Sequence, residues 1–227
     1  MIEFRPVSLA DQVYERLEAC ILNGTYEKGE ILSEQRLSKE LGVSRTPIRE
    51  ALSRLEYEKL IKETSTGNEV VGISLKDVND LFEVKKRIEV LATMWCASNI
   101  DEDGLKELKD IVEQQEFYAQ KEDAVKVRDL DTEFHDCIYN NCGSIVLQGI
   151  LSPIHHKLMK YRQASLEIEH RIMDSVKEHK RIYESIRDGK IGEVEGLILV
   201  HIEHAHHCII EVTERTRTAM EEENKNK

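Results

Sequence analysis

The spacing of apolar residues changes at residue 74, and this change constrains the fold more than any other feature of the chain. Beyond Ser74, apolar residues recur at helical spacing, with short turn signals between the stretches. These stretches cover approximately residues 74–95, 103–119, 123–140, 144–162, 172–188 and 192–219. Because such helices bury their apolar faces against one another, we predict an all-α bundle of six or seven helices.

The first helix of this bundle has a recognisable start. Ser74 with Asp77 resembles a capping box. We expect the inner face of the helix to consist of Val78, Leu81, Val84, Ile88, Leu91 and Trp95. At the far end of the chain, residues 221–227 (EEENKNK) include no apolar residue. We therefore expect the bundle to occupy residues 75–220 and residues 221–227 to form a disordered tail.

Residues 1–74 have a different pattern, with shorter helices. Apolar residues at helical spacing predict a first helix that ends at Asn23–Gly24. Ser33 is the N-cap candidate of a second helix, which ends at Gly42. Ser44 is the N-cap candidate of a third helix.

Two short strands are predicted after the third helix. Residues 61–64 and 69–73 have the composition of strands, and Gly67–Asn68 is a turn signal between them. Three helices followed by a hairpin are the layout of a winged helix-turn-helix domain, which we place at residues 1–74. The expected fold is therefore mainly α: an N-terminal winged helix-turn-helix domain joined to an all-α bundle.

The charge of the chain is acidic but unevenly distributed. The chain has 44 Asp and Glu against 32 Lys and Arg, a formal net charge of −12, which excludes a wholly basic nucleic-acid binder. Most of the acidic excess lies in the bundle, whereas residues 35–49 include only one acid, Glu40. The cations of this segment are Arg36, Lys39, Arg45 and Arg49. Because local charge governs contact with a polyanion, the segment is a candidate nucleic-acid surface.

Cysteine usage and hydropathy place the chain in a reducing, aqueous compartment. The five cysteines are an odd number and form no CxxC pair, so we interpret them as reduced thiols. No apolar run reaches the roughly 18 residues of a membrane span, and the N-terminus lacks a signal-peptide pattern. We expect a soluble, cytoplasmic protein without a membrane partner.

The start of the third helix, SRTPIRE, has side chains of the types that contact DNA in helix-turn-helix motifs. Arg45 and Arg49 lie four residues apart and share one face, with Thr46 beside them. In a helix-turn-helix motif the second helix enters the major groove, where an arginine fork matches the O6/N7 edge of guanine. From spacing alone, a solvated helix with ordinary surface arginines is an equally good interpretation.

A longer sequence motif in this region favours the DNA-binding interpretation. The stretch ILSEQRLSKELGVSRTPIREALSRLEYEKLI, followed by NEVVGIS, closely resembles the GntR family of bacterial transcription regulators across residues 7–74. The resemblance implies base and phosphate contacts from the third helix, further contacts from the preceding helix, and a glycine at the wing tip near the minor groove. With the basic patch and the helix start included, the expected DNA-contacting residues are Ser33, Gln35, Arg36, Ser44, Arg45, Thr46, Arg49 and Gly67. Many family members carry Arg where this chain has Gln35.

The histidines of the chain suggest a metal site in the bundle. All nine lie beyond residue 134. Asp131 and His135 are four residues apart and project from one helix face, while His179 and His201 belong to two later helices. Imidazole and carboxylate ligands together suit Zn, Ni, Mn or Fe. From the pattern alone, surface or hydrogen-bonded core histidines are the more common alternative.

The order of these motifs resembles the FCD ligand-binding domain of the FadR subfamily of GntR regulators. The sequence shows DLDTEFH, IYNNCGS, EHKRIYESIRDG and then His201, across residues 75–219. The resemblance implies that a divalent transition metal, zinc or nickel, is held by one aspartate and three histidines. In this chain they are Asp131, His135, His179 and His201.

The chain departs from the family at the position that binds anions. Many members have an arginine four residues before a glutamate in the first helix of the domain, where this chain has Lys85 before Glu89. Lysine carries the charge but lacks the bidentate fork. We therefore nominate Lys85, with Arg87 or Arg162 as substitutes, for binding the effector.

The remaining histidines have weaker claims. His204, His206 and His207 follow His201 on the last helix, where a solvated face is the simplest interpretation, although His204 could compete as a ligand. Of His155 and His156, we expect one to face inward and one outward.

Three functions are consistent with these features. The first is a homodimeric regulator that binds a palindromic DNA operator and responds to a small organic acid at the metal site. The second is a regulator for which the metal ion itself is the signal. The third is a metal-dependent hydrolase with Glu133 or Glu178 as general base, which would leave the helix-turn-helix unexplained. We expect the first, and no enzymatic activity.

Overall fold

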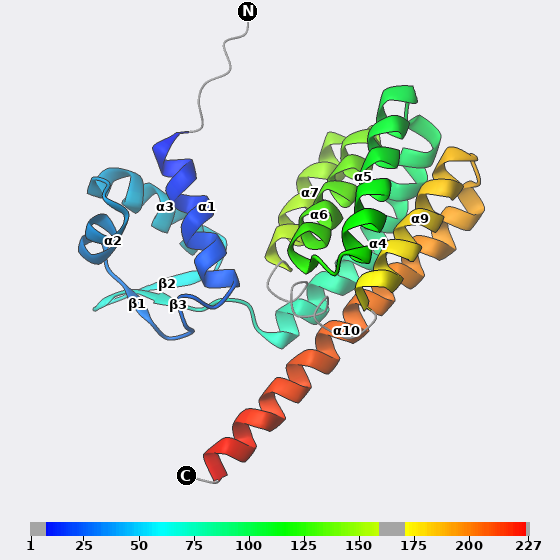
Figure 1. Ribbon diagram of the computed structural model, residues 1–227. Helices are drawn as coiled ribbons and strands as arrows, with labels where there is room; N and C mark the ends of the chain where they lie inside the picture. Colours follow the sequence, from blue (N-terminus) through cyan, green and yellow to red (C-terminus); the bar gives the residue numbers. More distant parts are fainter. Residues whose placement is uncertain (1–7, 159–170, 226–227) are drawn as a thin grey trace, which may run out of the picture. The chain divides into compact units, whose positions relative to one another are not determined.

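The computed structural model describes residues 8–158 and 171–225. The chain divides into two compact units, Met1–Ser74 and Leu75–Lys227, each with its own apolar core. Figure 1 shows the mixed α and β elements of the first unit and the helices of the second. No helix within the described ranges is long and apolar enough to cross a membrane.

The first unit packs three helices against a small sheet. Its elements are α1 (Leu9–Leu22), β1 (Ile31–Leu32), α2 (Glu34–Leu41), α3 (Arg45–Tyr57), β2 (Ile61–Thr64) and β3 (Gly67–Val70). The sheet is antiparallel with the order β1-β3-β2. The centre of the core consists of Leu17, Leu37, Ile48 and Leu55, all fully buried. The prediction of three helices and a hairpin is confirmed, and β1 is an additional strand.

The helix ends of this unit follow the predicted residues, with one difference. Asn23 is the C-cap of α1, and Gly42 ends α2 in the left-handed conformation at φ 67°. The Ser33 hydroxyl accepts a bond from the Arg36 N–H and caps α2. Ser44 has the extended backbone of an N-cap, but its side chain makes no cap hydrogen bond. Ser44 is thus the N-cap of α3, as predicted, but without the side-chain hydrogen bond.

The wing hairpin turns two residues earlier than expected. Thr64 pairs with Gly67, so the turn is Ser65–Thr66 and β3 begins at Gly67. The Thr64 hydroxyl donates to the Gly67 carbonyl at 2.6 Å and closes the turn. Gly67 has φ 133°, which a residue with a side chain rarely adopts. The glycine is therefore needed beside the turn and not within it.

The second unit is a helical bundle. Its described helices are α4 (Leu75–Asn99), α5 (Glu102–Gln120), α6 (Ala124–Asn141), α7 (Ile145–Lys157), α9 (Arg171–Arg187) and α10 (Ile191–Lys225). They match the six predicted stretches, although the predicted end of the fourth stretch, beyond residue 158, lies outside the described residues. Helices α4, α5, α6 and α9 lie side by side (Figure 1). The fold class, a winged helix-turn-helix with an all-α bundle, is confirmed.

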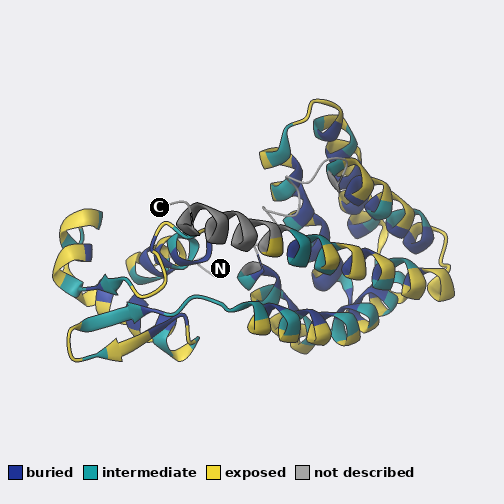
Figure 2. Ribbon diagram, turned by 90° about the horizontal axis from the view of Figure 1, so that it is seen from below, coloured by how far each residue is buried: buried dark blue, intermediate teal, exposed yellow. Residues whose placement is uncertain are grey.

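Helix α4 buries a face only partly the same as the predicted one. Val78 is fully buried and Leu81 and Ile88 pack against the core, as predicted, whereas Val84, Leu91 and Trp95 are exposed. The prediction was wrong for these three because α4 carries apolar residues on two faces and its buried face holds a charged pair, Lys85 and Glu89. The apolar row beside the buried face, here named the α4 stripe, consists of Leu81, Val84, Ile88, Leu91 and Trp95; three of them are exposed and two half-buried. Figure 2 shows the buried and exposed faces along the bundle helices.

Helix α10 continues further than the sequence analysis expects. It extends through Lys225, into the segment 221–227 that was expected to be a disordered tail. Neither proline nor glycine follows Gly196, and the Glu and Lys residues of the terminus favour helix. The helix can therefore continue without an apolar face.

Candidate functional site

The residues expected to contact DNA lie on the surface of the first unit. Six of them, Gln35, Arg36, Ser44, Arg45, Thr46 and Arg49, are exposed, and Ser33 and Gly67 are half-buried. On α3 the apolar residues Ile48, Leu52 and Leu55 are buried. The two arginines therefore occupy the outward face of α3, as the i, i+4 spacing predicted.

Ion pairs orient two of the three arginines. The Arg49 guanidinium donates to both oxygens of Glu34, at 2.9 and 3.0 Å. Arg36 donates to Glu30 at 2.6 Å. Arg45 makes no ion pair with any residue that the structure describes. The outward face of α3 thus carries Arg45, which has no ion pair in the described structure, and Arg49, whose guanidinium plane is fixed by Glu34.

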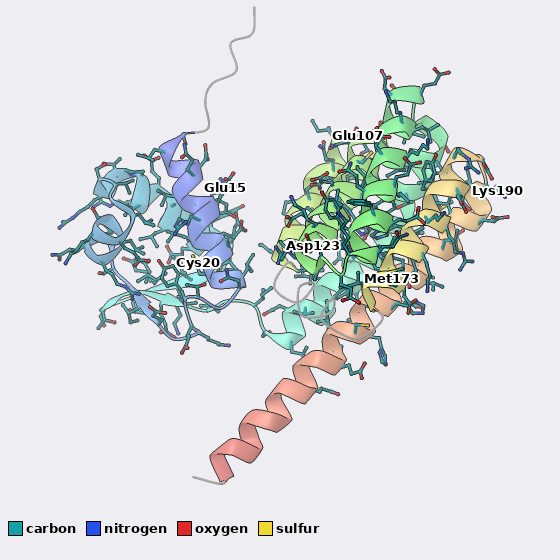
Figure 3. All side chains as sticks on the ribbon, viewed as in Figure 1. Glu15, Cys20, Glu107, Asp123, Met173 and Lys190 are labelled. Atoms are coloured by element: carbon teal, nitrogen blue, oxygen red, sulfur yellow. The ribbon has the colours of Figure 1, made fainter. Side chains whose placement is uncertain are left out.

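A second candidate site lies inside the bundle. Asp131 and His135 project from α6, His179 from α9 and His201 from α10, and one potential ligand atom of each lies within 4.8 Å of all the others. All four side chains are buried. Figure 3 shows how side chains fill the space between these helices. The structure thus brings together all four residues nominated from the sequence.

The imidazoles converge through their Nε2 atoms. The Nε2 of His201 lies 3.3 Å from the Nε2 of His179 and 3.3 Å from the Nε2 of His135. The Nε2 of His179 lies 3.5 Å from Oδ1 of Asp131. Ligands about 2.0–2.1 Å from a tetrahedral metal are about 3.4 Å apart, so these spacings fit one ion.

Two of the three imidazoles are held through Nδ1 by hydrogen bonds. The Nδ1 of His179 lies 2.9 Å from Gln115 and that of His201 lies 2.7 Å from Glu178. The Nδ1 of His135 lies 2.6 Å from Glu89, without the geometry of a hydrogen bond. An Nδ1 proton donated to these oxygens would leave Nε2 with a lone pair that faces the cluster. A cation at the centre of the cluster would satisfy these lone pairs.

The electrostatics of the cluster favour neutral imidazole. Burial, with Lys85 and His201 nearby, holds the pKa of His135 well below its usual value. His135 therefore stays unprotonated at neutral pH, which is the form that binds metals.

Helix α4 closes one side of this site with a buried ion pair. The Nζ of Lys85 lies 2.7 Å from Oε2 of Glu89, and the Tyr139 hydroxyl donates to Oε1 of Glu89 at 2.8 Å. Lys85 is therefore adjacent to the cluster. Arg87 is exposed and lies 3.9 Å from Glu83, so its nomination for the effector site is not supported by its position. Arg162 lies outside the described residues.

Three residues close to the imidazole Nδ1 atoms, Glu89, Gln115 and Glu178, had not been predicted in this role. Glu178 was considered only as a general base, although its position next to His179 could have drawn attention to it. Glu89 was noted only as the partner of Lys85. Gln115 had no signal, because 64 positions separate it from His179. Contacts of this kind depend on how helices pack and not on local spacing.

Three of the other histidines have described contacts. His204, which is exposed, bonds Glu178 at 2.8 Å. His206 stacks on Phe82 and bonds Asn79, so it is not part of a purely solvated face as expected. His155 is fully buried, with its ring 4.7 Å from that of His135. The side chain of His156 lies outside the described part of the structure.

Family comparisons cover most of the chain. The bacterial regulatory proteins of the gntR family match residues 9–66, and the FCD domain matches residues 80–204. The first match contains Arg36, Arg45 and Arg49, and the second contains all four residues of the Asp/His cluster.

Individual relatives span the full arrangement. An uncharacterized HTH-type transcriptional regulator of Bacillus subtilis, YdhC, is 29% identical over 203 residues, covering 88% of this chain and 90% of that protein. The gluconate operon transcriptional repressor of the same organism is 27% identical over 174 residues, covering 77% and 71%. The solved structure of E. coli McbR/YncC has the same fold, with a TM-score of 0.69 at 18% identity, covering 96% of this chain and 100% of that one.

Both relatives from Bacillus subtilis are named as transcription regulators. The order of domains, the fold and the matched residues lead to one conclusion. The chain belongs to the GntR family of bacterial transcription regulators and carries the FCD domain of its FadR-like members.

Proposed function

We propose that this regulator holds a divalent transition metal in its bundle, and that a small organic acid at this metal controls its affinity for a palindromic operator. One observation carries the proposal. Three imidazole Nε2 atoms and the Asp131 carboxylate converge in a buried cluster, and the imidazoles of His179 and His201 are fixed by hydrogen bonds at Nδ1. Such preorganisation is expected of a metal site and has no evident use in a packed core.

In this proposal the first unit, residues 1–74, binds the operator. Helix α3 enters the major groove, with Arg45, Thr46 and Arg49 at base edges and phosphates. The exposed Ser44 hydroxyl, which caps no N–H group, is suited to a phosphate. Supporting contacts come from Ser33, Gln35 and Arg36, and Gly67 lets the wing approach the minor groove.

The second unit binds the metal in this proposal, through the expected domain at residues 75–220. The Asp131 carboxylate is buried within the cluster, and the nearby Glu89 carboxylate pairs with Lys85. A divalent cation would interact favourably with a carboxylate in such a buried site. Three imidazoles and one carboxylate suit zinc or nickel.

The proposed effector is a small hydroxycarboxylate. Its carboxylate would complete the coordination of the metal, and the buried ammonium of Lys85 would attract its charge. The gluconate operon repressors of two Bacillus species are relatives of this chain. Gluconate is itself a hydroxycarboxylate, which supports this chemical class for the effector and supports a repressor role for the chain.

Helix α4 connects the two proposed activities. It carries Lys85 and Glu89, which line the metal cluster, and it begins at Leu75, directly after the DNA-binding unit. An effector that changes the position of Lys85 or Glu89 would therefore act on the helix that follows the wing. The mechanism is a shift between populations that differ in affinity for the operator.

A homodimer is also part of the proposal. The α4 stripe has apolar residues spaced alternately three and four positions apart, which is the a/d spacing of a helix–helix seam. Its exposed members include Leu91 and Trp95, at 38% and 42%. A second copy that packs on this stripe would bury it, and the two-fold symmetry would match a palindromic operator.

Elemental analysis tests the metal site. Protein purified without chelators or nickel resin is expected to contain about one equivalent of a transition metal per chain, and His135→Ala is expected to lose it. His207→Ala, which changes an exposed histidine outside the cluster, is the matched control and should retain the metal. Absence of metal from the wild type and both variants would contradict the proposal.

A metal-responsive regulator is the second candidate, supported by the same cluster. This candidate differs from the first in one expected result: its DNA affinity would depend on the metal alone, with no organic acid required. A hydrolase has less support. Glu133 is exposed, and Glu178 is occupied by bonds to His201 and His204, so neither nominated base is placed to activate water.

A further inference from the structure

One acidic residue lies among the residues expected to contact DNA. Glu34 is the first residue of α2, between Ser33 and Gln35. A carboxylate on a surface that approaches phosphates weakens binding by like-charge repulsion. The contacts of Glu34 indicate what this acid contributes in return.

Glu34 holds the guanidinium of Arg49 along one edge. The Nε of Arg49 donates to Oε1 at 2.9 Å, and Nη2 donates to Oε2 at 3.0 Å. Two parallel bonds fix both the plane and the direction of the guanidinium, although the Arg49 side chain is 70% exposed. The hydrogen bonds from Arg49, with Arg45 nearby, hold the pKa of Glu34 below its usual value, so the carboxylate stays ionised at neutral pH.

This pairing leaves the other edge of Arg49 accessible. A guanidinium has five N–H donors, and Glu34 accepts two of them. The edge formed by Nη1 and Nη2 can still donate two parallel bonds to O6 and N7 of a guanine. Arg49 can therefore contact Glu34 and a base at the same time.

We propose that Glu34 is a specificity-determining residue that acts through Arg49, by presenting the Nη1/Nη2 edge of its guanidinium to a guanine in the major groove. This inference rests on the proposed function, because it requires α3 to be the recognition helix. Without Glu34, Arg49 would lose more side-chain freedom on binding and would contact phosphates and other bases as readily. Glu34 thus contributes to sequence preference and not to general DNA affinity.

The test measures binding of the full chain to two kinds of probe. The first is a duplex that the wild type selects from a random-sequence pool, together with all its single-base variants. The second is a random-sequence duplex of equal length. The Arg49→Ala variant identifies the guanine that Arg49 contacts, because preference for it is lost. Glu34→Ala is expected to reduce the preference for this same guanine by about tenfold, while its affinity for the random duplex stays equal or rises.

Two further variants sharpen this comparison. Glu34→Gln keeps one acceptor for Arg49 and is expected to give an intermediate preference. Glu50→Ala is the matched control, because it removes an exposed carboxylate of α3 that makes no ion pair within the described residues; the guanine preference should not change. If Glu34→Ala lowers the melting temperature, Glu34→Gln carries the test.

A double-mutant cycle separates the possible roles of Glu34. Added to Arg49→Ala, the Glu34→Ala change should cause no further loss of preference. A further loss would mean that Glu34 itself accepts from a base, and an unchanged or higher preference in Glu34→Ala alone would mean that it competes with DNA. Either result would overturn the inference. If the wild type selects no sequence at all, the proposed function fails instead.

Discussion

The two nitrogens of each histidine in the candidate metal centre have different partners. Gln115 and Glu178 bond the Nδ1 atoms of His179 and His201, and Glu89 lies 2.6 Å from that of His135, while the Nε2 atoms face the cluster. A carboxylate behind an imidazole makes it a stronger donor and fixes its orientation. The anchoring residues therefore determine metal affinity together with the ligands.

Replacement of Gln115 by leucine tests this role of an anchor. Gln115→Leu keeps the side-chain volume but removes the acceptor for His179, so metal affinity is expected to fall about 10- to 100-fold. Competition with a chromophoric chelator measures the change. Gln115→Glu, which restores an acceptor, should recover most of the affinity, and Gln114→Leu on the exposed neighbour should have no effect. Equal affinity in Gln115→Leu and the wild type would show that the anchor is irrelevant.

Arg45 gives a second prediction at the scale of single residues. Because it is exposed and makes no ion pair within the described part of the chain, its donors are available to a base or phosphate. Arg45→Ala is expected to weaken operator binding by about 1–3 kcal/mol. Fluorescence anisotropy with a labelled operator measures this loss, and Arg16→Ala on the exposed face of α1 is the control. Equal losses in the two variants would remove Arg45 from the recognition surface.

At the scale of elements, α4 has two apolar faces with different expected partners. One face, with Phe82 and Cys96, packs into the bundle and carries the Lys85–Glu89 pair. The other face is the α4 stripe. Since a solvent-exposed stripe of this length is unusual on a monomer, we expect it to be covered in the assembled protein.

A charge placed in the α4 stripe tests this expectation. Leu91→Asp is expected to shift the protein from dimer to monomer at micromolar concentration, because burial of an unpaired carboxylate opposes association. Light scattering after size-exclusion chromatography measures the mass. Val125→Asp, on a more accessible position of α6 at 55% exposure, should leave the mass unchanged. A Leu91→Asp variant that stays dimeric would place the interface elsewhere.

The same helix shows how far element-level prediction reaches. Apolar spacing located α4 and its neighbours but could not choose between two apolar faces, because a buried Lys–Glu pair makes the inner face look polar. In the wing, the Gly67–Asn68 signal gave the right region and the wrong turn. Caps and periodicity are local, whereas the choice of face and of hairpin register depends on packing.

At the scale of the whole molecule, the chain joins two units at residues 74 and 75. Sequence motifs were enough to predict both units and to nominate the cluster of Asp131, His135, His179 and His201. The anchors on α4, α5 and α9 could not be predicted, since they come from helices whose mutual register has no signature in one sequence. In the proposed function, helix α4 couples the cluster to DNA binding.

Operator affinity as a function of metal and organic acid tests this coupling most directly. The wild-type chain, either metal-loaded or chelator-stripped, would be titrated with gluconate and with other hydroxycarboxylates while operator binding is followed. We predict at least one acid that changes operator affinity by about tenfold or more in the metal-loaded protein and not in the stripped protein. An equal response without metal, or a full response to metal with no acid present, would contradict the account.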